Sequence, residues 1–428
     1  MRPGYKQTEV GVIPQDWEVQ PFTGVTSLIT CGIAATPEYV SERRGYPFLS
    51  SSNVKEGRIV WSDYKHISAD LHRQLYRNNP PQKGDILYSR VGTFGEAAVV
   101  DVDFEFSVYV SLTLIKPGKP LDSFFLMQLL NSNAYKRRAK DQIYLGGGVG
   151  NLNVDVVRRY PIVIPPLPEQ RAIAAALTDV DALLDGQNRL IAKKRDLKQA
   201  AMQQLLTGQT RLPGFHGEWE VKQLGDAGRC LRGVSYRGDS DLAAYDTAHT
   251  KRLLRANNVQ SAVVVTQDVQ FVNADRVSKQ QILLQDDILV CMANGSKALV
   301  GKAGLFAVGD GHEYTFGAFM GCFRTDARSA HPRFVFALFQ TGQYRDYINN
   351  LLAGSSINNL RPSSVESLQF RFPKLQEQVA IAAALSDIDA ELSALEARRD
   401  KTRGIKQGMM QELLTGRTRL VPVETTNA

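Results

Sequence analysis

The sequence predicts an α+β protein in which two mixed α/β domains are separated by a pair of long antiparallel coiled-coil helices, with a pseudo-twofold internal repeat. Three observations support this. The stretch that begins at Glu169 recurs at Glu377, 208 positions later without a gap, and 25 of its 44 positions are identical. Apolar residues in both copies follow helical spacing, and a β-rich segment precedes each copy. A repeat this long is no solenoid, so it indicates two half-molecules in one chain.

Composition is compatible with several classes of globular protein. The chain has 428 residues, of which 43% are hydrophobic and 22% charged, so we expect more than one ordinary domain. The net charge of +7 permits a nucleic-acid partner but does not require one. On charge alone, a basic protein without such a partner is equally consistent.

Other features argue against metal, secretion and membrane insertion. The four cysteines contain no CxxC pair, and no histidine stands at a spacing that completes a zinc site. The first residues have no apolar core, and no run approaches the ~18 apolar residues of a membrane span. We therefore predict a cytoplasmic protein without a metal site, with free thiols at Cys31, Cys230, Cys291 and Cys322.

Each half presents its parts in the same order. It opens with a Trp-Glu-Val strand signal, at Trp17 and again at Trp219. A turn then feeds a short apolar strand, Gly84-Asp85-Ile86-Leu87 in one half and Asp286-Asp287-Ile288-Leu289 in the other. The strand runs into a glycine-bearing loop, after which more β-rich sequence follows. The two halves therefore share one predicted frame.

A helix and a small-residue turn follow in each half. We predict one helix over 123–143 and another that starts after His331-Pro332. Short strands at 158–164 and 368–372 come next, before proline-rich punctuation. The side chains predicted to face the core are Phe125, Leu129, Leu130, Tyr135, Phe334, Leu338, Phe339, Tyr344 and Ile348. The predicted boundaries are domain 1 at 1–165, helical region 1 at 166–212, domain 2 at 213–373, helical region 2 at 374–420 and a tail at 421–428.

The repeated stretch predicts a helix of about 38 residues, or roughly 57 Å. Its apolar residues form a heptad seam that would pair the helices and help to bind partners: Ile173, Leu177, Val180 and Leu184, then Ile381, Leu385, Ile388 and Leu392. Gln187, Lys194, Arg399 and Thr402 interrupt the seam, which we expect to resume at Leu197, Ala201, Leu205, Ile405, Met409 and Leu413. Such a helix needs an equally long partner, which a pseudo-twofold axis supplies in antiparallel orientation, with one domain at each end. The alternative is two core helices packed inside their own domains.

These residues carry a resemblance to a known family. The pattern Pro-Leu-x-Glu-Gln-x-x-Ile-Ala extends from Pro166 to Asp181 and recurs from Lys374 to Asp389, where a lysine replaces the usual proline. Leu-Leu-Thr-Gly ends both helices, at Gly208 and Gly416. Over essentially its whole length the chain resembles the specificity subunits of type I restriction-modification systems.

The resemblance implies a function. Such a subunit has two target recognition domains, each of which reads one half of a bipartite double-stranded DNA site, here expected to be asymmetric. The helices set the spacer and dock two modification (methyltransferase) subunits, which methylate adenine, and restriction/translocase subunits join them. S-adenosylmethionine, ATP and Mg are then expected in the partner subunits, with no cofactor and no catalytic residue in this chain.

Motifs for other chemistry are incomplete. Asn79-Pro80-Pro81-Gln82 resembles the signature of adenine methyltransferases, but Gln82 replaces the aromatic residue that would stack on the flipped base. We therefore predict a proline turn before a strand. The sequence has no Walker A motif, and its six histidines form no motif with a nucleophile.

DNA contacts are expected on loops that are equivalent in the two halves but differ in chemistry. Arginine and lysine suit guanine and phosphate, whereas asparagine suits adenine. Taken singly, each candidate is also consistent with a solvated loop or a helix cap. The candidates in the first half are Ser89, Arg90, Thr93, Tyr144, Asn151 and Asn153, and those in the second are Asn294, Ser296, Lys297, Ser355, Ser356, Asn358 and Asn359. A basic helical face at Lys136, Arg137, Arg138 and Lys140 is either a phosphate contact or a solvated face.

Two other functions remain open on the sequence. One is a coiled-coil scaffold whose globular domains bind no DNA. The other is a specificity subunit of a system that only methylates. Neither the bases of the target nor the length of the spacer follows from the residues.

Overall fold

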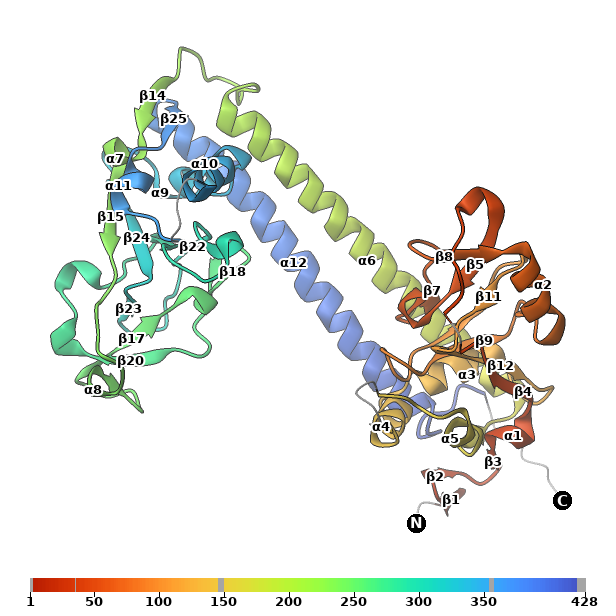
Figure 1. Ribbon diagram of the computed structural model, residues 1–428. Coiled ribbons are helices and arrows are strands. Elements are labelled where there is room, and N and C mark those ends of the chain that lie inside the picture. The colour runs from red at the N-terminus through yellow and green to blue at the C-terminus, as the bar shows by residue number, and fades with distance from the viewer. Residues whose placement is uncertain (1–2, 35, 145–149, 354–357, 422–428) are drawn as a thin grey trace. The chain divides into compact units, whose positions relative to one another are not determined.

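The computed structural model describes residues 3–34, 36–144, 150–353 and 358–421, shown as a ribbon in Figure 1. The chain forms two compact units. Unit 1 comprises Met1–Arg189 and Ala397–Ala428, and unit 2 comprises Leu190–Glu396. Each unit therefore contains one globular domain and a part of both long helices, α6 (Leu167–Thr207) and α12 (Leu375–Leu413).

Two sheets form the domain of unit 1. The larger has the order β10 (Ala97–Val99), β9 (Ile86–Ser89), β12 (Leu112–Pro117) and β4 (Thr26–Cys31). The smaller has the order β11 (Ser107–Val108), β5 (Gly45–Leu49) and β8 (Lys65–Ser68), with β11 parallel to β5. Three two-stranded pairs complete it: β1 (Tyr5–Thr8) with β2 (Gly11–Pro14), β3 (Glu18–Pro21) with β13 (Pro161–Ile164), and β6 (Val54–Lys55) with β7 (Arg58–Ile59).

The helices of this domain are α1 (Phe22–Val25), α2 (Ala69–Asn78), α3 (Ser123–Leu130), α4 (Asn133–Asp141) and α5 (Val154–Arg158). The prediction of one helix over 123–143 was wrong, because α3 and α4 are separate. The Asn131 amide bonds to both the backbone N–H and the C=O of Ala97 on β10. The next residue, Ser132, caps α4 by accepting from Tyr135 N. The four predicted core residues of this segment are buried.

Unit 2 repeats the frame with a larger sheet. Its order is β15 (Gly228–Arg232), β24 (Met320–Thr325), β21 (Ile288–Cys291), β22 (Ala303–Leu305), β19 (Val263–Val264) and β18 (Val259–Gln260). The first four strands correspond to β4, β12, β9 and β10. A second sheet has the order β16 (Leu242–Ala243), β20 (Gln270–Asn273), β17 (Thr250–Leu254) and β23 (Tyr314–Phe316), and β14 (Glu220–Gln223) pairs with β25 (Gln369–Phe372).

The helices of unit 2 repeat the same interruption. They are α7 (Leu224–Ala227), α8 (Gly238–Asp241), α9 (Pro332–Leu338), α10 (Gly342–Ala353) and α11 (Pro362–Glu366). The helix expected after His331-Pro332 is therefore two helices, since Thr341 accepts from Tyr344 N where α10 begins. The five predicted core residues here, Phe334 to Ile348, are buried.

Contacts between α6 and α12 show the predicted antiparallel pairing within each unit. In unit 1, Lys406 bonds to Asp181 at 2.7 Å and Gln187 donates to Thr402 at 3.2 Å. In unit 2, the ion pairs are Lys194 with Glu391, Lys198 with Asp389 and Arg195 with Glu396. In unit 1 the α12 partner falls from 406 to 402 as the α6 residue rises from 181 to 187, and in unit 2 it falls from 396 to 389 between Arg195 and Lys198, as antiparallel packing requires. The helices are 41 and 39 residues long, close to the predicted length.

The apolar seam agrees with the prediction over the first half of each repeat and departs from it at some positions in the second half. Ile173, Leu177, Ile381, Leu385 and Leu392 are buried, and Val180, Leu184 and Ile388 are half-buried. Two predicted seam positions are wrong: Leu197 is 53% exposed and Ile405, its equivalent in the repeat, is 52% exposed. Gln187 and Thr402 interrupt the apolar seam as predicted: both are buried, and they bond to each other.

The Glu-Gln pair that opens each repeat has two separate structural roles. Gln170 accepts from Asp122 N and donates to Pro120 O and Pro165 O, which ties α6 to its own domain. Gln378 accepts from His331 N and donates to Pro373 O in the same way. Each glutamate instead pairs with an arginine that follows the end of the other long helix.

A buried carboxylate joins three parts of the chain in each unit. In unit 1, Glu169 is 1% exposed and accepts from the guanidinium of Arg419 and from Trp17 Nε1 at 2.9 Å. Arg419 follows the end of α12, lies over the Trp17 ring and also pairs with Asp16 at 2.8 Å. The hydrogen bond from Arg419 lowers the pKa of Asp16. We call this cluster anchor 1.

Anchor 2 is its equivalent in unit 2. Arg211, just after α6, donates from Nε and Nη2 to the buried carboxylate of Glu377, at 2.5 and 2.6 Å. Its guanidinium lies over the Trp219 ring, 5.5 Å from the ring centroid. The hydrogen bond to Glu377 raises the pKa of Arg211. Each anchor thus fastens the end of one helix to the start of the other and to the tryptophan that opens the domain.

Replacing Arg419 by methionine should destabilise unit 1 by about 3 kcal/mol, because the Glu169 carboxylate stays buried without its cation. Urea unfolding of the full chain, followed by tryptophan fluorescence, measures this. The control is Arg417→Met, which removes an exposed arginine whose ion pair with Glu412 spans 3.7 Å, and it should change stability by less than about 1 kcal/mol. Equal effects of the two substitutions would contradict the role of anchor 1.

Candidate nucleic-acid interface

Three segments meet beyond the ends of the central strands in unit 1: 90–91, 110–111 and 151–152. Arg90 N donates to Ser111 O at 3.0 Å, and Leu152 N donates to Arg90 O at 2.9 Å. Val91 and Asn151 form an isolated β-bridge, and so do Tyr144 and Asn151. The two loops that the sequence analysis selected separately are therefore adjacent.

Arg90 holds these segments together from inside. Its side chain is buried and donates to Leu152 O at 2.9 Å, to Val110 O at 3.0 Å and to Asn151 Oδ1 at 2.8 Å. Ser89 is also buried, and its hydroxyl accepts from Glu96 N. Because neither side chain faces solvent, neither is placed to contact a base, although both were predicted to do so. Ser89 ends β9 and Arg90 bonds to the neighbouring segments, so both residues position the loop.

The other candidates in unit 1 are exposed. Tyr144 is 73% exposed, and Thr93, Asn151 and Asn153 are exposed as well. Asn153 caps α5 by accepting from Asp155 N at 2.9 Å. Tyr144 therefore keeps its side chain available for a ligand, and the Thr93 hydroxyl makes only one long bond, 3.4 Å to Ser51 O, whereas Asn151 and Asn153 each have an acceptor engaged.

The same meeting of segments occurs in unit 2. Ala293 and Asn359 form an isolated bridge, equivalent to that of Val91 with Asn151, and Leu360 N donates to Met292 O at 2.7 Å. Asn358 Nδ2 donates to Gly295 O at 3.2 Å, and Asn294 Oδ1 accepts from Ser296 N. Asn294 and Asn358 thus shape the loops.

Ser296, Lys297 and Asn359 are the exposed candidates of unit 2. Across the described residues, the amide of Asn359 makes no side-chain hydrogen bond. Ser355 and Ser356 lie outside the described residues. The position of Arg90 is taken here by Met292, which makes the equivalent backbone bonds without a charge.

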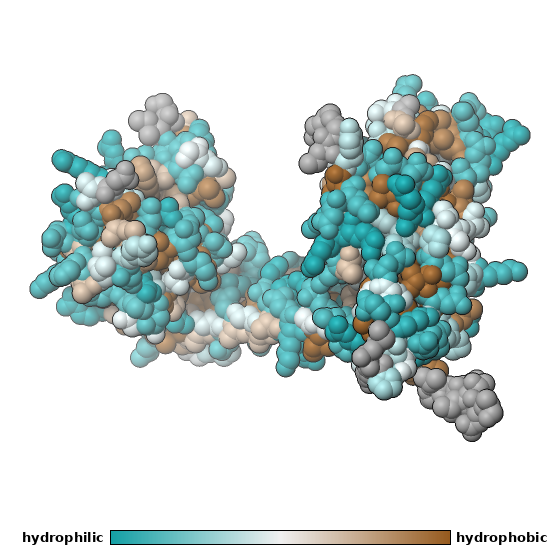
Figure 2. Space-filling view, turned by 90° about the horizontal axis from the view of Figure 1, so that it is seen from below, coloured by the Kyte–Doolittle hydropathy of each residue, from teal (hydrophilic) through white to brown (hydrophobic). Residues whose placement is uncertain are grey.

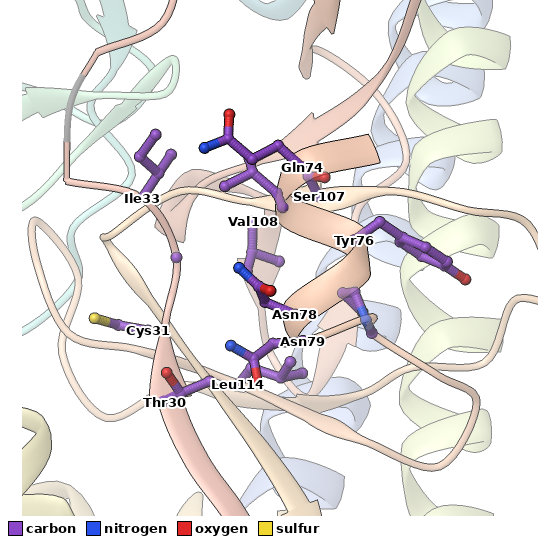
Figure 3. A pocket seen from close by; sticks show the side chains of 13 residues that line it. Thr30, Cys31, Ile33, Gln74, Tyr76, Asn78, Asn79, Ser107, Val108 and Leu114 are labelled. Atoms are coloured by element: carbon purple, nitrogen blue, oxygen red, sulfur yellow. The ribbon is translucent and has the colours of Figure 1, made fainter. Parts of the chain in front are cut away.

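Unit 1 also has a cavity of about 310 Å³ between α2, the end of β4 and β11 (Figure 3). Asn79 and Pro81 of the Asn-Pro-Pro-Gln segment line it, and that segment turns into β9 through a bond from Gln82 N to Asp85 Oδ2. The turn before β9 spans residues 82–85, where Asp85 N donates to Gln82 O at 2.9 Å, so it follows the two prolines instead of containing them as predicted.

His72 bonds to Ser107, which lines this cavity, and has partners that the sequence did not reveal. Its Nδ1 is 2.9 Å from Ser107 Oγ, and its Nε2 is 3.2 Å from Glu105 Oε2. The ring stacks on Tyr46 with 3.9 Å between centroids. His72 and Ser107 are both buried, so the chain of bonds fastens α2 to β11 and offers no exposed nucleophile.

The cysteines and acidic residues are candidates for metal ligands and for reactive groups. Among the described residues, no cluster of His, Cys, Asp or Glu has the arrangement to hold a metal ion. Burial raises the pKa of Cys230 to about 12, which keeps that thiol protonated at neutral pH. Of the helices in the described part of the chain, none is both long and apolar enough to cross a membrane.

Comparison with known proteins gives the class. The family model for the type I restriction modification DNA specificity domain matches twice, over residues 14–193 and 216–402. The chain belongs to this family, whose general role is the recognition of DNA sequence. Specificity subunits of type I systems are themselves non-catalytic.

Individual relatives agree with this assignment. The chain is 23% identical to the putative type I restriction enzyme MjaX specificity subunit of Methanocaldococcus jannaschii, over 97% of both chains. It is 30% identical to the EcoKI specificity subunit of Escherichia coli over 198 residues, which cover 46% of this chain and 42% of that one. The fold is similar to the crystal structure of the S subunit from M. genitalium, with a TM-score of 0.58 and 15% identity over 96% of this chain and 99% of that one.

Replacing Arg90 by methionine, the residue at the equivalent position of unit 2, should destabilise unit 1 by about 2 kcal/mol. Two backbone carbonyls and the Asn151 amide would lose a charged donor in a buried site. Denaturant unfolding measures the cost. The control is Thr93→Val in the same loop, where the exposed hydroxyl makes only one long contact, 3.4 Å to Ser51 O. A stable Arg90→Met variant would contradict the positioning role.

Proposed function

We propose that this chain is the DNA-binding specificity subunit of a type I restriction-modification complex, in which each domain reads one half of an asymmetric bipartite site. One observation carries the proposal. In both units the same backbone bonds join equivalent loops, while the side chains at equivalent positions differ, as with Arg90 and Met292. A shared frame with different surfaces suits two different half-sites.

The exposed candidates supply the two kinds of contact that a duplex requires. Lys297 provides a cation for phosphate, and Asn359 provides an amide suited to adenine. In the other domain, Thr93 and Tyr144 provide a hydroxyl and an aromatic ring. Arg90, Asn294 and Asn358 support the loops through their internal bonds.

The helices are proposed to set the spacer and to dock two modification subunits. The seam residues are occupied in holding α6 against α12, and anchors 1 and 2 hold the helix ends to the domains. A partner would then contact the outward faces of the helices. S-adenosylmethionine, ATP and Mg belong to the modification and restriction subunits in this proposal, which places the complex in the cytoplasm.

The test is binding of the chain together with its modification subunits to duplex DNA over a range of salt. We expect sequence-specific binding whose affinity falls as salt rises. Sequencing of the methylated DNA then gives both half-sites and the spacer. Absence of any salt-dependent preference for a duplex would favour the alternative of a coiled-coil scaffold. Methylation without cleavage, when all subunits are supplied, would favour a methylation-only system.

Replacing Lys297 by alanine should weaken DNA binding at every sequence and reduce the slope of log affinity against log salt by about 0.9, the value for one phosphate contact. The methylated sequence should stay the same. Binding titrations at several salt concentrations measure the slope. The matched control is Lys222→Ala, a half-buried lysine on β14 paired with Glu220 at 2.8 Å. A change of recognised sequence in Lys297→Ala would show a base contact instead.

Insertion of one heptad into both helices, after Arg189 and after Ala397, should lengthen the spacer. Seven helical residues span about 10 Å, which corresponds to about three base pairs of duplex. Both half-site sequences should remain unchanged. The same insertion in α6 alone breaks the register with α12 and should lower stability instead. Altered half-sites with an unchanged spacer would contradict the ruler function.

A further inference from the structure

Phe319 is a large apolar side chain held in an exposed position at the candidate interface of unit 2. It lies in the turn between β23 and β24 and is 72% exposed. Its carbonyl accepts from Met292 N at 2.9 Å and from Ala293 N at 3.1 Å. The backbone is therefore fixed beside the glycine loop and beside Asn359, which bridges to Ala293, while the ring projects into solvent.

The fold itself does not require an exposed aromatic ring at this place. The equivalent residue in unit 1 is Ser111, whose carbonyl accepts from Arg90 N just as that of Phe319 accepts from Met292 N. Ser111 is buried, and its hydroxyl accepts from Ser51 N at 2.9 Å. One backbone frame therefore buries a small polar side chain in one domain and exposes a phenyl ring in the other.

A phenyl ring exposed at this place offers apolar surface to a ligand, and burying that surface on binding would contribute favourable free energy. In the loop segment that contains Ser296 and Lys297, Leu299 is the exposed large apolar residue, at 40%. On the face of the molecule that Figure 2 shows, hydrophobic residues are interspersed among hydrophilic ones. Beside Phe319, the exposed residues of the interface are Ser296, Lys297 and Asn359, all polar.

The combination of an amide and a phenyl ring matches the major-groove edge of A·T pairs. An asparagine side chain bonds to adenine N6 and N7, and an apolar side chain contacts the 5-methyl group of thymine in the same groove. A protein partner would instead bury a wider apolar patch around an aromatic anchor. The polar neighbours and the nearby lysine favour DNA.

We propose that Phe319 is a specificity-determining residue that contacts the 5-methyl group of a thymine in the half-site read by unit 2. This inference rests on the proposed function and adds a residue to it. Phe319 was absent from the residues predicted from the sequence, because only the fold brings residues 317–319 beside the glycine loop.

The experiment uses the chain in complex with its modification subunits and the recognition sequence identified by methylation. Each thymine of the two half-sites is replaced in turn by uracil, which lacks only the methyl group. We expect one substitution, in the half-site of unit 2, to weaken binding roughly tenfold. Phe319→Ala should weaken binding to the thymine duplex by a similar factor and should no longer distinguish thymine from uracil at that position.

Val221→Ala is the control variant. Val221 is also strongly exposed in unit 2, but it lies on β14, outside the interface segments. It should bind like the unmodified chain and retain the response to uracil. Circular dichroism and size-exclusion chromatography of each complex check folding and assembly.

Three other results would contradict either the role of Phe319 or the proposed function. Unchanged affinity in Phe319→Ala, or the same response to uracil as in the unmodified chain, overturns the inference and leaves the proposed function intact. Loss of assembly with the modification subunits in Phe319→Ala also overturns it and identifies a protein contact. Absence of sequence preference in the unmodified complex refutes the proposed function itself.

Discussion

The pairing of a buried glutamate with an arginine that follows the other helix is the interaction on which the rest of the structure depends. The buried carboxylates of Glu169 and Glu377 accept hydrogen bonds from Arg419 and Arg211, and burying either carboxylate without that partner would be strongly destabilising. Each arginine also covers the tryptophan at the start of a domain. In each unit the start of one long helix, the end of the other and the opening of the domain therefore meet around one arginine. The two anchors also differ: Trp17 donates to its glutamate, whereas no partner is found for the indole nitrogen of Trp219 in the described structure.

These anchors explain why the repeated segments are so alike. The glutamate must meet an arginine from the other repeat, and the adjacent glutamine must bond to the backbone of its own domain. A change in either residue would leave buried polar groups unpaired in one of the two units. The domains between the repeats have to preserve only the backbone bonds that join their loops. Their side chains were free to differ, as Ser111 and Phe319 do.

The spacing of apolar residues along the sequence predicted where the helices lie, but it did not predict where two of them are broken. Helical spacing predicted α6 and α12 nearly to their ends, and it predicted the buried residues of α3, α4, α9 and α10. It missed the break between α3 and α4, because the amide of Asn131 bonds to a strand more than thirty positions away. It also extended the seam to Leu197 and Ile405, which tertiary packing leaves exposed.

By itself the sequence determined the class of fold, the family pattern and the two loop sets proposed as the interface, since periodicity, repeats and motifs are local properties of the chain. Only the tertiary structure decided which of those loop residues face solvent. Arg90 has the chemistry of a base contact, but three acceptors from segments 110 and 151–152 surround it. Phe319 has the chemistry of a core residue, but a turn between two strands holds it outside. Burial depends on contacts between segments distant in sequence, and residue type alone does not specify those contacts.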